Sequence, residues 1–217
     1  ARGLAELDVA AALAEAARQT GCALWIFDHQ GQPRAAVGYS FGLLLAALSR
    51  LGLLPDPRVE LAGALAAMRQ LQERLRAGVP TTRNPAKRLA GQLVGRWVAV
   101  FGSAVLEPVA RRWKCQINEN AKQPAFCSVI PELLHNEILA WDDERSRRHL
   151  CAVVLRSQDD AKADASRAAY LSLLLREKRV PVIEVDAPGT SPHERVLRLI
   201  YLGDFVSVYL ALSRRVD

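Results

Sequence analysis

The sequence predicts an α/β protein with three α/β/α layers, in which a doubly wound parallel sheet is preceded by an N-terminal helical extension. From residue 84 onward, short continuous apolar runs alternate with longer segments of helical periodicity. The runs are apolar throughout rather than at every second residue, which is typical of parallel strands with helices on both faces. The first 80 residues contain mainly helical patterns, which predicts the extension.

The elements of the sheet domain follow from this alternation. We expect strands at residues 97–102, 125–130, 150–156 and 180–186. We expect helices at residues 84–93, 106–122, 131–140, 160–178 and 192–213, the first with Asn84 as N-cap and Pro85 at its first helical position. In such sheets a ligand binds beyond the carboxyl ends of the strands, near Gly102, Ser103, the end of Ile130 and the loop after Arg156.

The N-terminal part has fewer strand signals. Residues 1–20 are Ala-rich and amphipathic, which predicts a helix. The run ALWIFD at 23–28 is a candidate strand that would close a βαβ element whose earlier strands lie outside this chain. Pro33 and Gly31 mark a turn, and two helices are expected at 39–54 and 58–77, before a linker at 81–85.

Composition narrows the possible partners. The chain has 217 residues, is 50% hydrophobic and carries a net charge of +6, with an isoelectric point near 9.5. The arginines are spread over predicted helices without a dense basic run, which argues against nucleic acid. The absence of a signal peptide or a long uncharged apolar run predicts a cytoplasmic protein that does not bind membranes. The cysteines show no metal-ligand spacing, so we expect no metal and no cofactor.

One stretch, WKCQINENAKQPAFCSVIPELLHNEILAW at 113–141, combines many polar groups with a core-like pattern. Arg112, Gln116 and Glu119 share a helix face that points away from an apolar stripe. Pro124 ends this helix, residues 125–130 are apolar enough for a buried strand, and Pro131 opens a helix that carries His135. A carboxylate and an imidazole thus flank one strand, although on spacing alone both are also typical of ordinary surface residues.

The segments QINENAK, PAF and PELLHNE resemble sequence motifs of the bifunctional phosphoglucose/phosphomannose isomerases. These enzymes have the SIS fold, which is flavodoxin-like. In that family an ENAK carboxylate and an HNE histidine sixteen positions later form the catalytic pair. The matching positions here are Glu119 and His135. With LEPVARRWK, QPRAAVGYSFG near the start and DFVSVYLAL near the end, the resemblance covers most of the chain.

The resemblance implies an isomerase that interconverts glucose 6-phosphate or mannose 6-phosphate with fructose 6-phosphate through an enediol. Glu119 would be the base, His135 would open the sugar ring, and Arg34 in QPRAA looks like the arginine that stabilises the enediolate. The family also implies a sugar phosphate substrate and a homodimer in which the histidine reaches the partner's site.

This chain departs from the family in lacking the Gly-Gly-Ser turn, the Ser/Thr-rich loop that holds the sugar phosphate, and a lysine after Lys178. We therefore interpret residues 1–35 as the tail of a first SIS domain, 36–83 as connecting helices and 84–217 as the C-terminal SIS domain. Such a portion is expected to be inactive alone. Two alternatives stay open: a non-catalytic SIS module that binds sugar phosphates for regulation, and an interaction or nucleic-acid-binding protein supported only by the high isoelectric point.

Overall fold

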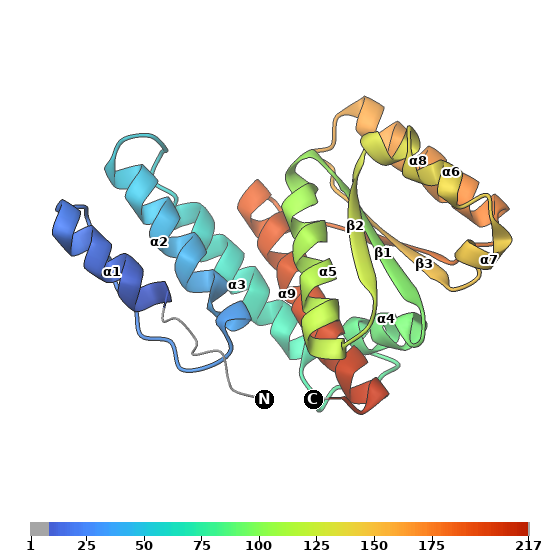
Figure 1. The fold of residues 1–217 in the computed structure, drawn as a ribbon, viewed down its shortest axis with the longest axis horizontal. Coiled ribbons are helices and arrows are strands. Elements are labelled where there is room, and N and C mark those ends of the chain that lie inside the picture. The colour runs from blue at the N-terminus through green and yellow to red at the C-terminus, as the bar shows by residue number, and fades with distance from the viewer. Residues whose placement is uncertain (1–8, 217) are drawn as a thin grey trace. The chain divides into compact units, whose positions relative to one another are not determined.

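The protein is described by a computed structural model over residues 9–216 (Figure 1). The chain divides into two compact units, residues 1–57 and residues 58–217. Each unit is described by itself.

The first unit is helical, as the sequence predicts. It contains α1 (Val9–Thr20), the 3₁₀ helix η1 (Pro33–Ala36) and α2 (Val37–Arg50). The start of the helix predicted over residues 1–20 lies outside the described residues. The rings of Phe27 and Tyr39 stack with their centroids 4.8 Å apart. None of the side chains from 11 to 57 is buried, so this part of the chain has no core of its own.

The strand predicted at residues 23–28 does not form. Residues 22–30 belong to no helix or strand, and the apolar side chains of Trp25 and Ile26 are 44% and 70% exposed. A strand needs a hydrogen-bonded neighbour, and the sheet formed by the described residues lies wholly in the second unit. An apolar run alone therefore does not make a strand here.

The second unit contains the predicted parallel sheet, with strand order β2-β1-β3-β4. Its strands are β1 (Trp97–Ser103), β2 (Ala125–Ile130), β3 (Leu150–Arg156) and β4 (Val182–Asp186). Its longer helices are α3 (Arg58–Leu75), α4 (Pro85–Leu93), α5 (Glu107–Ala121), α8 (Lys162–Glu177) and α9 (Pro192–Arg214). As predicted, Asn84 caps α4, because its side chain accepts a hydrogen bond from the Lys87 amide.

Helices cover both faces of this sheet, which confirms the three-layer architecture (Figure 1). On one face, Val98 and Val100 of β1 pack in a core with α4, α5 and α9. On the other face, Ala99 and Phe101 pack in a second core with α8 and the short segments between β2 and β3. Successive residues of β1 from Val98 to Phe101 thus enter opposite cores, so this part of the strand is apolar at every position.

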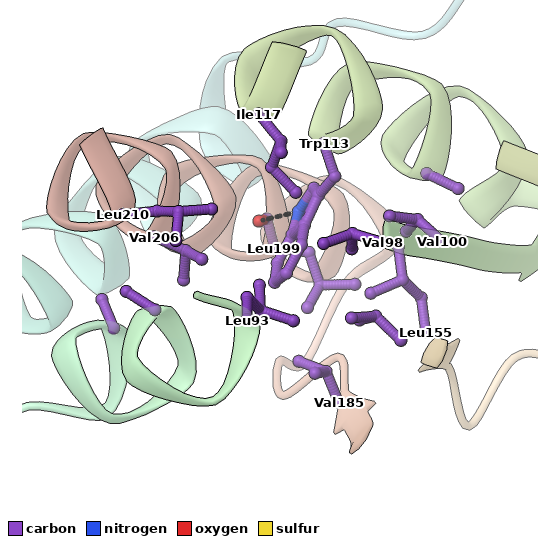
Figure 2. Packing of buried hydrophobic residues seen from close by; sticks show 14 of the residues in the cluster. Leu93, Val98, Val100, Trp113, Ile117, Leu155, Val185, Leu199, Val206 and Leu210 are labelled. Carbon is purple, nitrogen blue, oxygen red and sulfur yellow. Dashed lines mark hydrogen bonds between the residues drawn. The ribbon is translucent and has the colours of Figure 1, made fainter. Parts of the chain in front are cut away.

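The contact between α5 and α9 is very close and lies in the first core. The indole of Trp113 donates a hydrogen bond of 2.9 Å to the Leu199 carbonyl, and the ring lies among the labelled side chains of Figure 2. A Cβ atom on Gly203 would lie 2.2 Å from the indole nitrogen. Only glycine at this position allows the two helices to approach this closely.

Two local predictions for the central stretch were wrong. Residues 125–130 form a strand, but Cys127, Ser128 and Val129 are only half-buried because β2 is at the edge of the sheet. The helix predicted over 131–140 is broken into η3 (Glu132–Leu134) and α6 (Glu137–Ala140). The Asn136 side chain accepts a hydrogen bond from the Glu137 amide, which starts a new helix after the break.

Among the described helices, α9 is long and apolar enough to cross a membrane by length and composition. It packs against α3, α4 and α5, and its Asp204 pairs with Arg112 of α5. These contacts are those of a core helix in a globular domain. The short helices η2 (Ala104–Leu106) and α7 (Glu144–Arg147) complete the unit.

Candidate active site

Glu119 lies in the last turn of α5, and its side chain is exposed. The helix ends at Ala121 because Lys122 adopts a left-handed conformation with φ 50°. The Lys122 ammonium donates to the Glu119 carbonyl at 2.7 Å, and Arg214 donates to the Ala121 carbonyl at 2.5 Å. Two cations therefore satisfy carbonyl groups that every helix leaves open at its C-terminus.

Polar residues on both sides of Glu119 in the sequence bind α9. Asp204 accepts hydrogen bonds from Arg112 at 2.8 Å and from Gln116 at 3.0 Å, and Gln116 is only 5% exposed. Asn120 donates to the Ser207 hydroxyl at 2.9 Å. Of the three residues predicted on one polar face, Arg112 and Gln116 therefore face α9, and Glu119 alone is exposed.

Asn118 joins the end of α5 to the beginning of β2. Its side-chain carbonyl accepts from the Ala125 amide at 2.8 Å, and its amide group donates to the Ala125 carbonyl at 3.2 Å. The side chain thus replaces the backbone partner that Ala125 lacks at the edge of the sheet. The residue before Glu119 is fixed to the first residue of β2.

His135 lies beyond the other end of β2. It is the residue after η3, its amide donates to the Glu132 carbonyl at 2.9 Å, and its side chain is exposed. The neighbours Leu133 and Ile138 are 1% and 8% exposed, and both enter the second core. His135 therefore lies on a tight turn between two buried anchors rather than on the continuous helix that was predicted.

The structure does not bring Glu119 and His135 of one chain together. Because α5 connects two parallel strands, it runs back along the sheet and ends at the amino end of β2 (Figure 1). His135 follows the carboxyl end of the same strand. Six residues of strand span about 17–20 Å, which is too far for both groups to act on one sugar ring.

Arg34 lies in the first unit, within η1. Its guanidinium donates to the Gln32 side chain at 3.1 Å, and its side chain is half-buried. The turn predicted around Pro33 is therefore a 3₁₀ helix that starts with this proline, as the fixed φ of proline favours.

A polar network lies at the carboxyl end of the sheet, and the sequence analysis named only its Ser103 and the loop after Arg156. The Ser103 hydroxyl donates to Asp160 at 2.9 Å, which links the end of β1 to the loop after β3. Arg195 of α9, only 4% exposed, donates to Asp159 at 2.6 Å and to the Gly189 carbonyl at 2.6 Å. Arg195 is distant in sequence from this loop and carries no motif, so no local pattern indicated its place here.

This network occupies the place where doubly wound sheets usually bind a ligand. β1 leads to β2 on one side and β3 leads to β4 on the other, so the switch point lies between β1 and β3. There, the Asp160 carboxylate accepts hydrogen bonds from the Ser103 hydroxyl and the Ser157 amide. These two donors would otherwise be able to bind a phosphate. As predicted, Ser103 and the loop after Arg156 meet, but the groups they present include carboxylates.

The fold and the sequence together define the class of protein to which this chain belongs. A glucose-6-phosphate isomerase like protein from Thermus thermophilus shares the fold with a TM-score of 0.65 at 26% identity, covering 77% of this chain and 56% of that one. The family described as "Bacterial phospho-glucose isomerase C-terminal SIS domain" matches residues 82–217, which include both Glu119 and His135. The protein is therefore of the SIS class. It belongs to this bacterial phospho-glucose isomerase family.

Two relatives support the assignment over most of the chain. A bifunctional phosphoglucose/phosphomannose isomerase from Caldicellulosiruptor bescii is 38% identical over 182 residues, covering 83% of this chain and 54% of the relative. The enzyme of the same name from Aquifex aeolicus is 30% identical over 199 residues, covering 92% and 58%. This chain thus spans little more than half the length of these relatives.

Proposed function

We propose that this chain carries the catalytic pair of an aldose–ketose isomerase that interconverts glucose 6-phosphate or mannose 6-phosphate with fructose 6-phosphate. The observation that carries the proposal is the family match over residues 82–217, which contains Glu119 and His135. The names of the two relatives support the same reaction.

The chemistry assigned to each residue is a proton transfer. His135 moves a proton between the C1 hydroxyl and the ring oxygen, which opens the sugar, because an imidazole can both give and take a proton near neutral pH. The Glu119 carboxylate then takes the C2 proton and returns it to C1 of the enediolate, which yields the ketose. Arg34 is proposed to stabilise the negative charge of the enediolate.

The distance between Glu119 and His135 supports a homodimer. Because β2 separates the two groups within one chain, a complete site requires His135 from a second copy beside Glu119 of the first. Closed symmetry would then give two equal sites per dimer. The hydrogen bonds of Asn118 at one end of β2 and the buried Leu133 and Ile138 beyond the other fit this arrangement, since they fix each group to its own chain.

The switch-point geometry supports a phosphate site outside this domain. Asp160 already takes the hydroxyl and amide donors there, and a second carboxylate, Asp159, lies in the same loop. A dianionic phosphate would be repelled by carboxylates at that place. The sugar phosphate is therefore proposed to be held by a separate part of the full-length protein.

The test is a coupled assay of the full-length protein with glucose 6-phosphate and mannose 6-phosphate. Formation of fructose 6-phosphate from either sugar, with loss of turnover in Glu119→Gln, is expected. Binding of both sugar phosphates by calorimetry without any turnover would instead favour the non-catalytic regulatory module.

A further inference from the structure

The turn that carries His135 is tied to the middle of β2 by a side-chain contact. The Ser128 hydroxyl donates a hydrogen bond to the Glu137 carboxylate, two residues after His135. Ser128 lies on the face of β2 that points toward the second core, as does Ile130, and both partners are half-buried. A hydrogen bond to an ionised acceptor in such a place is stronger than a neutral one.

The short helices around the turn cannot hold it by themselves. η3 has three residues and α6 has four, so neither helix is stable in isolation. Leu133 and Ile138 anchor the turn in the core, but apolar contacts are non-directional. The Ser128–Glu137 bond adds a directional contact between the strand and the residues that follow His135.

A second side-chain contact holds the amino end of the strand. Asn118 makes two hydrogen bonds to the backbone of Ala125, the first residue of β2, and Glu119 is the next residue along α5. Each candidate reactive group is thus close in sequence to a side chain that binds the same strand. β2 therefore fixes the spacing of the two half-sites that one chain contributes.

We propose that Glu137, held by Ser128, is a positioning residue for His135 and acts on ring opening alone. The proposal rests on the proposed function of His135. It predicts that loss of the Ser128–Glu137 bond impairs the step assigned to His135 and spares the proton transfer assigned to Glu119, which Asn118 positions separately. A merely structural bond would instead lower stability and leave the ratio of the two steps unchanged.

The two steps can be measured separately in the full-length protein. Exchange between the α and β anomers of glucose 6-phosphate, followed by NMR, requires ring opening without transfer of the C2 proton. Exchange of the C2 proton of an open-chain aldose phosphate with solvent skips ring opening, so its rate reports on the step assigned to Glu119 alone.

Glu137→Ala and Ser128→Ala should each slow anomer exchange about tenfold, because small misplacements of a reacting group are costly. Glu137→Gln keeps an acceptor for the Ser128 hydroxyl and should stay within about threefold of the wild type. The matched control, Asn118→Ala, should leave anomer exchange unchanged and slow C2 exchange. Thermal melts identify any variant that does not fold, in which case Ser128→Ala, the smallest change, decides.

Anomer exchange at the wild-type rate in Ser128→Ala and Glu137→Ala would overturn the proposal. So would equal losses in Glu137→Ala and Glu137→Gln, or parallel losses of both steps. A wild-type protein that binds glucose 6-phosphate but catalyses neither exchange would refute the proposed function instead, so the two failures are distinguishable.

Discussion

At the scale of single residues, the candidate catalytic groups are exposed but their neighbours are fixed. Glu119 follows Asn118, which is bound to β2, and precedes Asn120, which is bound to Ser207. His135 lies between the buried Leu133 and Ile138. Exposed reactive side chains on a fixed backbone fit a site that another surface completes.

Replacing the carboxylate tests the assigned base. Glu119→Gln in the full-length protein keeps the shape of the side chain but cannot accept the C2 proton. We expect C2 proton exchange with solvent to fall by about a hundredfold or more, the range typical of general base catalysis, while binding persists. Isotope exchange by NMR and calorimetry measure the two quantities. Exchange within about tenfold of the wild type would contradict the assignment.

Replacing the imidazole tests the assigned ring-opening group. His135→Ala should slow turnover of ring-closed glucose 6-phosphate far more than turnover of an open-chain aldose phosphate, which skips that step. Steady-state rates on the two substrates give the comparison. Equal losses on both would show that His135 is structural or acts in another step.

At the scale of the elements, the packing of α5 against α9 depends on Gly203. In Gly203→Ala, the new methyl group would lie 2.2 Å from the buried indole nitrogen of Trp113, which is held by the Leu199 carbonyl. We expect the free energy of unfolding to fall by about 1–3 kcal/mol or more, as for other overpacked cores. Denaturant titration measures this. Gly63→Ala on α3 is the matched control, because nothing lies within 4 Å of its Cβ; stability should not fall there.

The contacts of Glu194 at the start of α9 predict that the stability of the protein depends on pH. Glu194 accepts hydrogen bonds from the Thr190 amide and from Arg198, both at 2.9 Å, and these bonds lower the pKa of its carboxyl group. A lowered pKa in the folded state means that the ionised carboxylate stabilises the protein above its ordinary pKa. That stabilisation is lost as the pH falls through the lowered value.

Glu194→Gln should therefore lower the free energy of unfolding at neutral pH by about 0.3–1 kcal/mol, the usual contribution of an acidic residue in the first turn of a helix. The difference from the wild type should shrink as the pH falls below the ordinary range of a carboxyl group. Thermal unfolding across a pH series measures this. Glu177→Gln, at an exposed position of α8, is the control and should show little effect. A constant difference at all pH values would contradict the prediction.

Local patterns predicted most elements, and the failures have physical causes. All four strands of the sheet and the Asn84 cap were predicted because each depends on nearby residues. The half-exposed state of β2 depends on strand order, which no local pattern encodes. The break in the helix that carries His135 had a usable signal, since Asn136 before Glu137 is a typical N-cap.

The site residues likewise divide into those that the sequence identified and those that only the fold brings together. The motif identified Glu119 and His135 as candidates, and their assigned roles stay predictions. Their supports, Ser128 with Glu137 and Asp204 with Gln116, are formed by contacts between separate elements. The sequence could not show that β2 separates Glu119 from His135, because this follows from the direction in which α5 returns along the sheet.

At the scale of the whole molecule, the separation of the two groups determines how many chains a site needs. One chain offers a base at the amino end of β2 and an imidazole beyond its carboxyl end, about 17–20 Å apart by strand length. The two reacting positions of a hexose lie in one ring. We therefore expect a complete site to combine Glu119 of one copy with His135 of another.

Subunit mixing tests this arrangement. Full-length Glu119→Gln and His135→Ala proteins should each be inactive, but after subunit exchange about half of the dimers combine both variants, and one of the two sites in each has both wild-type groups. Activity should then reach about one quarter of the wild-type value by this statistical argument. The coupled assay before and after exchange measures it, and two batches of the same variant mixed together serve as the control. If both groups acted within one chain, no mixture would regain activity, and a monomer in sedimentation at micromolar concentration would contradict the arrangement directly.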